Sequence, residues 1–479
     1  MKILFAASEA APFAKVGGLG DIAGALPGAL CALGHDVRLI MPKYGVIPEK
    51  YVRSFEFVTD FTVLIGSAYK YVGLFRTVYQ GVTVYLIDNE EYFGGSVYGY
   101  SGSGEIERTV FFCRAILEAL PHLDFAPELI HVNDWQTALI PVLLRYQYPA
   151  LNLKTVLTIH NLRYQGIFGI SDLRDLTGLP ASLFTMEGLE FYGAANILKG
   201  GILHSDKVNT VSPRYAVETL TPEYGEQLDG VLRSRSGDYS GILNGIDYGV
   251  FHPRTDPKIA AAYGPRNLAG KQICKQSLAD ELSLDGEKMI ISVISRLVDQ
   301  KGLDILSECA ESLLQENRFS LVVLGTGEAQ YESLFASLSA RYDNMRAILR
   351  YDGDLAQRIY AGSDLLLVPS RFEPCGLTQL IAMKYGTLPL VRETGGLYDT
   401  VRPYNEQDGS GYGFTFAPYA AHDLAFTIRR ALSFYENDPK LWKKLMQRAM
   451  TQDFSWKQSA SAYVALYAQA LGQAIPESI

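Results

Sequence analysis

The sequence predicts an α/β protein with two doubly wound domains, each built around a parallel sheet. Short apolar, β-branched segments alternate with helical patterns along the chain, as is typical of βαβ units with helices on both faces of a sheet. The alternation occurs once on each side of a turn-rich segment at residues 240–247. A chain of 479 residues is also too long to fold around a single core.

The apolar segments place the expected strands. In the first half, strands are expected at Ile3–Ala7, Val37–Met41, Val82–Ile87, Leu129–Val132, Thr155–Ile159 and Val208–Val211. In the second half, they are expected at Met289–Ile294, Leu321–Leu324, Ala347–Tyr351, Leu365–Val368 and Leu388–Val391.

The turn-rich segment and the Pro253 that follows it mark the expected domain boundary. We assign residues 1–240 to a first domain, 241–253 to a linker or hinge, and 254–454 to a second domain. The last segment, Trp456–Leu471, has helical spacing that gathers one apolar face, formed by Trp456, Ala460, Tyr463, Tyr467 and Ala470. Because such a face needs a partner, residues 455–479 are expected to cross back onto the first domain.

The composition excludes several classes of protein. Hydrophobic residues make up 48% of the chain and charged residues 20%, which is ordinary for a globular protein. A net charge of -9 argues against a nucleic-acid surface. The five cysteines are scattered without a C-x-x-C pair, which favours reduced thiols and a cytoplasmic location. The chain has neither a secretory signal nor an apolar segment of ~18 residues, so no membrane partner is expected.

The segment Ser370–Gln379 carries the most specific chemistry. It follows an expected strand and precedes a helical pattern, at the sheet edge where open α/β sheets bind ligands. Glu373 can accept hydrogen bonds from hydroxyls, and the free backbone N–H groups of Gly376, Leu377 and Thr378 can face an anion. A sugar joined to a diphosphate needs both. The alternative is a capped turn with a surface glutamate.

Two further segments offer positive charge and close backbone approach. Lys15, Gly17 and Gly18 precede a helical pattern, and paired glycines let a backbone approach a phosphate closely. Arg296 and Lys301 lie on one expected strand-end loop, near enough in sequence to converge on a diphosphate. The alternatives are a simple turn and two solvated charges. A similar pair of glycines, Gly395-Gly396, opens a helix in the second half.

Polar residues also follow two strands of the first half. Asp134 and His160 each follow an expected strand, so either could belong to an active site or be structural. The histidines lack metal-ligand spacing, and neither a G-x-S-x-G nor a G-x-G-x-x-G motif is in place. The Gly/Tyr/Ser segment 91–104 is expected to be a loop whose tyrosines stack on sugars, or a plain insertion.

Together these motifs resemble one family, the bacterial glycogen synthases and their plant relatives, the starch synthases. The resemblance runs from residue 1 to the C-terminal helix and rests on the order and spacing of several independent motifs. These are Lys15–Leu19, His131–Trp135, Thr158–Asn161, Asn244–Asp247, Ser295–Gly302, Ser370–Gln379 and Thr394–Leu397.

The resemblance implies a GT-B glycosyltransferase, in which two Rossmann-like domains face a central cleft. The first domain would bind the acceptor and the second the nucleotide sugar. Such an enzyme transfers glucose from ADP-glucose to the non-reducing end of glycogen or another α-1,4-glucan, with retention of configuration and with neither a metal ion nor a further cofactor.

The resemblance also implies a role for each residue of this chain that matches a family motif. Arg296 and Lys301 would hold the diphosphate, assisted by Lys15 and the backbone of Gly17 and Gly18. Glu373 would hold glucose hydroxyls, Tyr351 would stack on adenine, and the backbone carbonyl of His160 would lie near the anomeric carbon. Asp134 would place the sugar, and Asp21 would lie near the reacting centre. Many relatives carry a second glutamate eight positions after the first, whereas this chain has Ile381 there.

The physical chemistry agrees with a metal-free transfer. Negative charge develops on the leaving diphosphate, and fixed cations and helix N-termini can stabilise it. Because the sequence singles out no carboxylate nucleophile, front-face attack is favoured over a covalent intermediate.

Three alternatives stay open. A related transferase could use UDP-glucose, because an aromatic ring stacks on any base. A starch synthase proper is less expected, since no transit peptide precedes Met1. From another class, the chain could be an inactive sugar-nucleotide sensor or glucan-binding protein, although an inactive copy has no reason to keep all four charges at Lys15, Arg296, Lys301 and Glu373.

Overall fold

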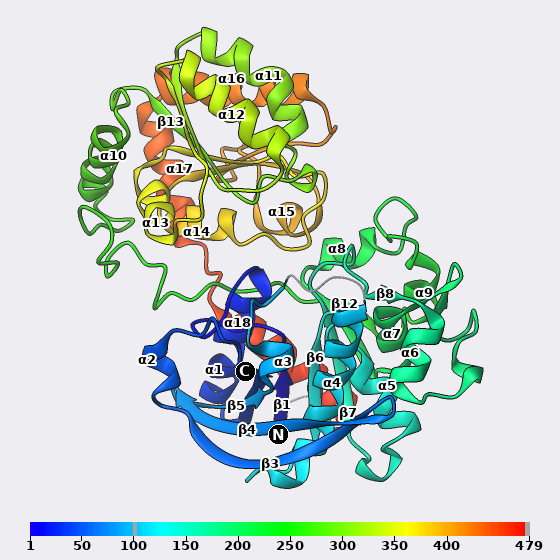
Figure 1. Ribbon diagram of the computed structural model, residues 1–479. Coiled ribbons are helices and arrows are strands. Elements are labelled where there is room, and N and C mark those ends of the chain that lie inside the picture. The colour runs from blue at the N-terminus through cyan, green and yellow to red at the C-terminus, as the bar shows by residue number, and fades with distance from the viewer. Residues whose placement is uncertain (99–102, 475–479) are drawn as a thin grey trace. The chain divides into compact units, whose positions relative to one another are not determined.

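The computed structural model describes residues 1–98 and 103–474, and the chain forms two compact units (Figure 1). Unit 1 contains Met1–Gly245 and the segment from Trp456 onward, and unit 2 contains Ile246–Ser455. The chain first crosses from unit 1 to unit 2 between Gly245 and Ile246, inside the expected linker, and crosses back after Ser455. Across the described residues, the structure contains no helix long and apolar enough to cross a membrane.

Unit 1 is built on a nine-stranded sheet in the order β12-β11-β7-β6-β1-β2-β5-β4-β3. The strands are β1 (Lys2–Ala6), β2 (Asp36–Pro42), β3 (Glu56–Ile65), β4 (Ala68–Tyr79), β5 (Val82–Asp88), β6 (Leu129–Asn133), β7 (Lys154–Ile159), β11 (Lys207–Thr210) and β12 (Tyr239–Gly241). The parallel pairs β7–β6–β1 place the carboxyl ends of three strands next to one another. This edge is where the polar residues of the first half lie.

One part of the unit 1 sheet differs from the expected parallel arrangement. β3 and β4 form an antiparallel hairpin, and β4 also pairs antiparallel with β5. The segment carries alternating rather than continuous apolar residues, because β3 is an edge strand with one exposed face. Three short strands, also unpredicted, form a separate antiparallel sheet: β8 (Ile167–Phe168), β9 (Glu190–Phe191) and β10 (Ala194–Asn196).

The helices of unit 1 include one from the far end of the chain. They are α1 (Gly18–Ala32), α2 (Glu49–Val52), α3 (Glu90–Phe93), α4 (Ser103–Ala119), α5 (Leu139–Tyr146), α6 (Ile170–Thr177), α7 (Ile197–His204), α8 (Pro213–Glu218), α9 (Asp229–Ser234), α18 (Trp456–Leu471) and the 3₁₀ turns η1 (Leu120–His122), η2 (Pro149–Leu151) and η3 (Ala181–Leu183). In Figure 1 the red α18 lies beside the blue α1. The apolar face predicted for this helix is buried in the unit 1 core, which confirms the spacing argument.

Unit 2 is built on a six-stranded, fully parallel sheet in the order β15-β14-β13-β16-β17-β18. The strands are β13 (Met289–Ile294), β14 (Phe319–Leu324), β15 (Met345–Ile348), β16 (Leu365–Val368), β17 (Leu388–Arg392) and β18 (Phe414–Phe416). The helices are α10 (Ala269–Leu282), α11 (Leu303–Gln315), α12 (Ala329–Arg341), α13 (Gly353–Gly362), α14 (Thr378–Lys384), α15 (Gly395–Thr400), α16 (Ala421–Asn437), α17 (Pro439–Thr451) and the 3₁₀ turn η4 (Asp299–Lys301).

The strand expected at Ala347–Tyr351 is wrong at both ends, since β15 begins at Met345 and stops at Ile348. Asp352 explains the early end, because its side chain caps α13 by accepting the N–H of Leu355 at 2.9 Å. Tyr351 therefore lies in a short connection rather than in the sheet, with 78% of its surface exposed.

The two chain crossings lie side by side at the boundary of unit 2. The N–H of Ile246 donates to the carbonyl of Phe454 at 2.8 Å, and Ile246 and Ser455 form a parallel bridge. The Tyr248 hydroxyl accepts the Phe454 N–H at 2.8 Å. These bonds pair the first crossing of the chain with the second.

Candidate active site

The unit 1 site begins where β6 and β7 end. The N–H of His160 donates to Asp134 Oδ1 at 2.7 Å, so the two predicted residues are in direct contact. Asp134 has a φ of 54°, a conformation that aspartate tolerates better than most residues and that often marks functional positions. Its own N–H donates to the Thr158 carbonyl at 2.9 Å, which fixes this conformation.

The electrostatics of this pair favour neutral groups. Desolvation raises the pKa of Asp134 to about 7, although the N–H groups of His160 and Asn161 partly offset it. Burial lowers the pKa of the His160 imidazole to about 3. The His160 ring is therefore neutral at physiological pH, and its Nε2 lies 2.9 Å from Asn133 Oδ1. A neutral, fixed ring suits a positioning role better than proton transfer.

The glycine-rich segment of unit 1 starts a helix, as predicted. Gly17 is the N-cap of α1, and Gly18 is its first residue. Lys15 Nζ lies 2.7 Å from Asp21 Oδ1, and the two side chains are 33% and 31% exposed. Desolvation raises the pKa of Asp21, and the Lys15 ammonium acts against this. The structure thus brings the predicted Lys15 and Asp21 together.

Glu9 belongs to this segment, and the sequence argument missed it. Its carboxylate accepts the N–H groups of Val16 and Gly17, and only 1% of its surface is exposed. The signal in the sequence was its place, two residues into the segment after an expected strand, where ligand-side residues of parallel sheets lie.

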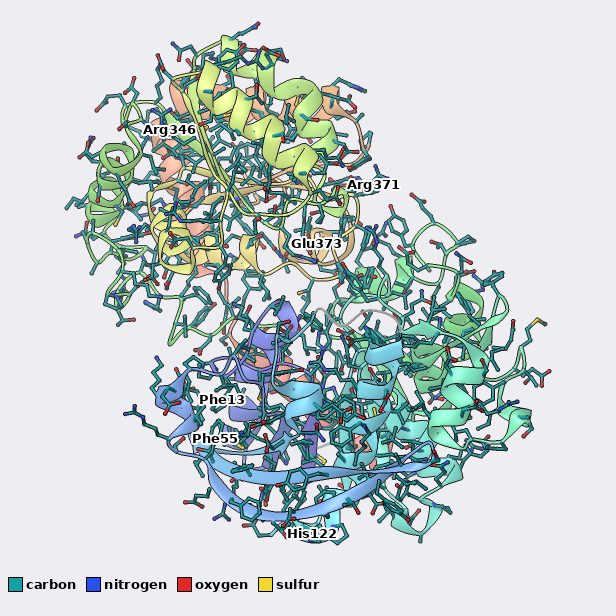
Figure 2. All side chains as sticks on the ribbon, viewed as in Figure 1. Phe13, Phe55, His122, Arg346, Arg371 and Glu373 are labelled. Carbon is teal, nitrogen blue, oxygen red and sulfur yellow. The ribbon has the colours of Figure 1, made fainter. Side chains whose placement is uncertain are left out.

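The unit 2 site lies after β16. Glu373 is buried, with Lys301 Nζ at 2.7 Å and the Ser370 hydroxyl at 2.9 Å from Oε2. A surface glutamate is therefore excluded. Figure 2 labels Glu373 with Arg371 from the same loop; Arg371 pairs with Asp304 at 2.9 Å. Ser370 was part of the predicted motif without a role of its own.

The helix start after Glu373 has the predicted geometry. Gly376 has a φ of 73°, and a Cβ added there would lie 2.5 Å from Gln379 Oε1, so the position needs glycine. Leu377 is the N-cap of α14, and Thr378 is its first residue. Ile381, where relatives were expected to carry a second glutamate, is buried in the core of unit 2.

Arg296 and Lys301 lie on the same connection after β13. Arg296 is exposed, whereas the Lys301 side chain is 18% exposed and ends the turn η4. Gly302, which follows, has a φ of 70°, and a Cβ there would lie 1.9 Å from the Pro369 carbonyl oxygen. Glycine permits this close approach, and the N–H of Arg371, which donates to the Gln300 carbonyl at 2.9 Å, joins the Lys301 turn to the Glu373 loop.

Two remaining predictions concern metals and the tyrosine loop. Among residues 1–98 and 103–474, the structure contains no cluster of three His, Cys, Asp or Glu side chains that could hold a metal ion. The loop predicted to stack on sugars falls partly outside the described residues, because Tyr100 belongs to the segment 99–102, which the structure does not describe. Of its described part, Tyr98 is buried enough for desolvation to raise the pKa of its hydroxyl.

Comparison with known proteins assigns the chain first to a class. Residues 2–234 match the family model of the starch synthase catalytic domain, and residues 275–449 match glycosyl transferases group 1. A solved structure, the catalytic domain of starch synthase IV from Arabidopsis thaliana bound to ADP and acarbose, superposes with a TM-score of 0.92. It is 34% identical and covers 98% of this chain and 99% of its own. The protein is a two-domain GT-B glycosyltransferase, as predicted.

The particular family follows from the sequence relatives. The chain is 48% identical to a glycogen synthase of Clostridium acetobutylicum over 480 residues, covering 98% of this chain and 100% of the relative. It is 46% identical to a glycogen synthase of Anoxybacillus flavithermus over 475 residues, covering 98% and 97%. The chain belongs to the glycogen synthase family. A sucrose-phosphate synthase from Thermosynechococcus elongatus, 19% identical with a TM-score of 0.63 and coverage of 98% and 99%, shares the fold alone.

Proposed function

We propose that this enzyme transfers glucose from ADP-glucose to the non-reducing end of an α-1,4-glucan such as glycogen, with retention of configuration. The observation that carries the proposal is the buried Glu373–Lys301 pair at the carboxyl edge of the unit 2 sheet. It combines an acceptor for sugar hydroxyls with a cation for phosphate. The glycogen synthase relatives and the ADP-bound starch synthase support the choice of donor and acceptor.

The residues of unit 2 act on the donor. Arg296 and Lys301 hold the diphosphate, and Glu373 accepts hydrogen bonds from hydroxyls of the transferred glucose. The backbone N–H groups of Gly376, Leu377 and Thr378 face the donor's anionic part. The exposed Tyr351 ring stacks on adenine.

The residues of unit 1 act on the reacting sugar and its acceptor. The backbone carbonyl of His160 lies near the anomeric carbon, and Asp134 places the sugar. Lys15 and the backbone at Gly17 and Gly18 add to the grip on the diphosphate, and Asp21 lies near the reacting centre. Residues 1–240 thus bind the acceptor and residues 254–454 the nucleotide sugar. The segment 241–253 is the hinge, and the C-terminal helix α18 crosses back to the first domain.

The chemistry needs no nucleophile from the protein. The bond between the anomeric carbon and the phosphate oxygen breaks as the acceptor's 4-hydroxyl attacks from the same face. The hydroxyl proton passes to the leaving phosphate, so ADP and a glucan longer by one unit are formed. Fixed cations stabilise the charge that develops on the diphosphate, and removing such a group typically costs ~10²–10³-fold in rate. A soluble cytoplasmic setting fits the five free thiols.

The direct test offers ADP-glucose and UDP-glucose separately with glycogen and measures released nucleoside diphosphate. ADP release that depends on glycogen, with product bonds cleaved only by an α-specific glucosidase, is expected. Release from UDP-glucose alone would support the alternative transferase, and binding of ADP without turnover would indicate a sensor.

Arg296 provides the matching variant test. Arg296→Ala should lower kcat by ~10²-fold or more with the fold intact, and EDTA should leave the wild type unchanged. Arg318→Ala is the control, because Arg318 is a partly exposed arginine of unit 2 paired with Glu436 at 2.5 Å. A strict requirement for added Mg²⁺ would contradict the role given to Arg296 and Lys301.

A further inference from the structure

Glu9 is a buried carboxylate beneath the glycine-rich segment of unit 1. Its Oε2 lies 2.5 Å from the N of Val16, and both its oxygens lie 3.2 Å from the N of Gly17. One side chain therefore holds the two N–H groups that immediately precede α1.

Burying this carboxylate costs desolvation free energy, which the hydrogen bonds only partly offset. Desolvation raises the pKa of Glu9, and the backbone N–H groups of Val16 and Gly17 act against it. Only 1% of the Glu9 surface is exposed, and a glutamate is almost never buried to this degree unless it is paired. Here the partners are the N–H groups of Val16 and Gly17. They immediately precede a 15-residue helix and would otherwise lack acceptors.

The segment held by Glu9 has little room to move. At its start, the buried Phe13 ring packs against Tyr51, Phe55 and Tyr79 with centroid distances of 5.5, 6.0 and 5.6 Å (Phe13 and Phe55 are labelled in Figure 2). At its end, a Cβ added to Gly20 would lie 2.9 Å from Lys15 Cγ. The Lys15 stem is thus packed on the first turn of α1.

We propose that Glu9 is a positioning residue that fixes Lys15 for the donor diphosphate. It does so by binding the N–H groups of Val16 and Gly17, the two residues that follow Lys15. This inference rests on the proposed function, in which Lys15 grips the diphosphate. It also changes which backbone group is expected to contact the diphosphate. The Gly17 N–H already has the Glu9 carboxylate as its acceptor, so Gly18 supplies the backbone contact to the donor.

The test is a double-mutant cycle between Glu9→Gln and Lys15→Ala. Glutamine keeps the shape, but its NH₂ group cannot accept the second N–H. Glu9→Gln should lower kcat/KM for ADP-glucose by up to about 10-fold in the wild-type background, which is no more than the loss expected for Lys15→Ala, because Glu9 acts through Lys15. In the Lys15→Ala background the same change should cost less than about 3-fold, because Lys15 is already absent. Equal losses in both backgrounds would overturn the proposal.

A second readout is independent of the enzyme's activity. Glu9→Gln should accelerate amide hydrogen exchange in the peptide covering 13–20, and Glu9→Asp should do so less. Unchanged exchange would show that Glu9 does not hold the segment. If exchange accelerates while Lys15→Ala keeps full activity, the role of Lys15 in the proposed function fails instead.

The matched control is Asp206→Asn. The Asp206 carboxylate also accepts a backbone N–H, that of Thr155 at 2.8 Å, and it also pairs with a lysine, Lys154, at 2.8 Å. It lies at the amino end of β7, away from the segment. Asp206→Asn should leave both kcat/KM and exchange in residues 13–20 unchanged, which separates positioning by Glu9 from a general loss of stability.

Discussion

The two units each pair a lysine with a carboxylate at the same distance, 2.7 Å, but in different surroundings. In unit 1 the Lys15 and Asp21 side chains are 33% and 31% exposed, whereas in unit 2 those of Lys301 and Glu373 are 18% and 8% exposed. Water reaches the first pair more than the second. A partly exposed ion pair contributes little to stability, while breaking a buried pair leaves an uncompensated charge.

The carboxyl groups near the two pairs also have different partners. In unit 1, desolvation raises the pKa of Glu9, Asp21 and Asp134, and backbone N–H groups rather than cations are the partners of Glu9 and Asp134. In unit 2, Glu373 has a cation and a hydroxyl in direct contact. Unit 1 therefore offers dehydrated hydrogen-bond acceptors, and unit 2 offers a charge-balanced pair.

The largest effect is expected from Glu373→Ala. It should lower kcat by ~10²–10³-fold while ADP binding changes little, because the lost contacts are to the sugar. Loss of the partner of Lys301 should also lower the free energy of unfolding by about 3 kcal/mol, measured by chemical denaturation. Glu436→Ala, which breaks a more exposed pair with Arg318, should change neither by a comparable amount. An equal fall in ADP affinity and turnover would move Glu373 from the sugar to the nucleotide.

A smaller effect is expected from Lys15→Ala. Because the side chains of the Lys15–Asp21 pair are 33% and 31% exposed, its loss should change the free energy of unfolding by less than about 1 kcal/mol. Steady-state kinetics should show kcat/KM for ADP-glucose reduced about 10-fold, against ~10²-fold or more for Lys301→Ala. If Lys15→Ala and Lys301→Ala lower the free energy of unfolding by the same amount, the difference in burial between the two pairs has no effect on stability.

The smallest effect is expected from the pH dependence of Asp134. Its pKa is about 7 in the folded chain, above its usual value of 3.8, so its contribution to stability is complete below pH ~3.8 and is lost as the pH rises through ~7. Relative to Asp134→Asn, the wild type should thus lose on the order of 1 kcal/mol of unfolding free energy between these values, since Asp134 keeps partial contact with water. Thermal unfolding at several pH values measures this. Parallel curves for the two proteins would show that Asp134 is not desolvated.

The sequence by itself determined the fold class, because the alternation of strand and helix signals is local. Ten of the expected segments coincide with parallel strands of the two sheets, and the glycine pairs at Gly17-Gly18 and Gly395-Gly396 lie at the starts of α1 and α15. The antiparallel hairpin of β3 and β4 was missed because a half-exposed edge strand lacks a continuous apolar segment. The roles given to the site residues stay predictions.

Tertiary structure decided which groups meet. Lys301 and Glu373 are 72 positions apart, and nothing local in either segment indicates that they form a buried pair. The same holds for Tyr467 of α18, whose hydroxyl lies 2.8 Å from His131 Nδ1 across 336 positions. Helical spacing predicted that this tyrosine faces a core, but its polar partner depends on the packing of α18 on unit 1. Periodicity records which side of an element is buried, whereas a contact between distant segments is fixed only when the whole chain has packed.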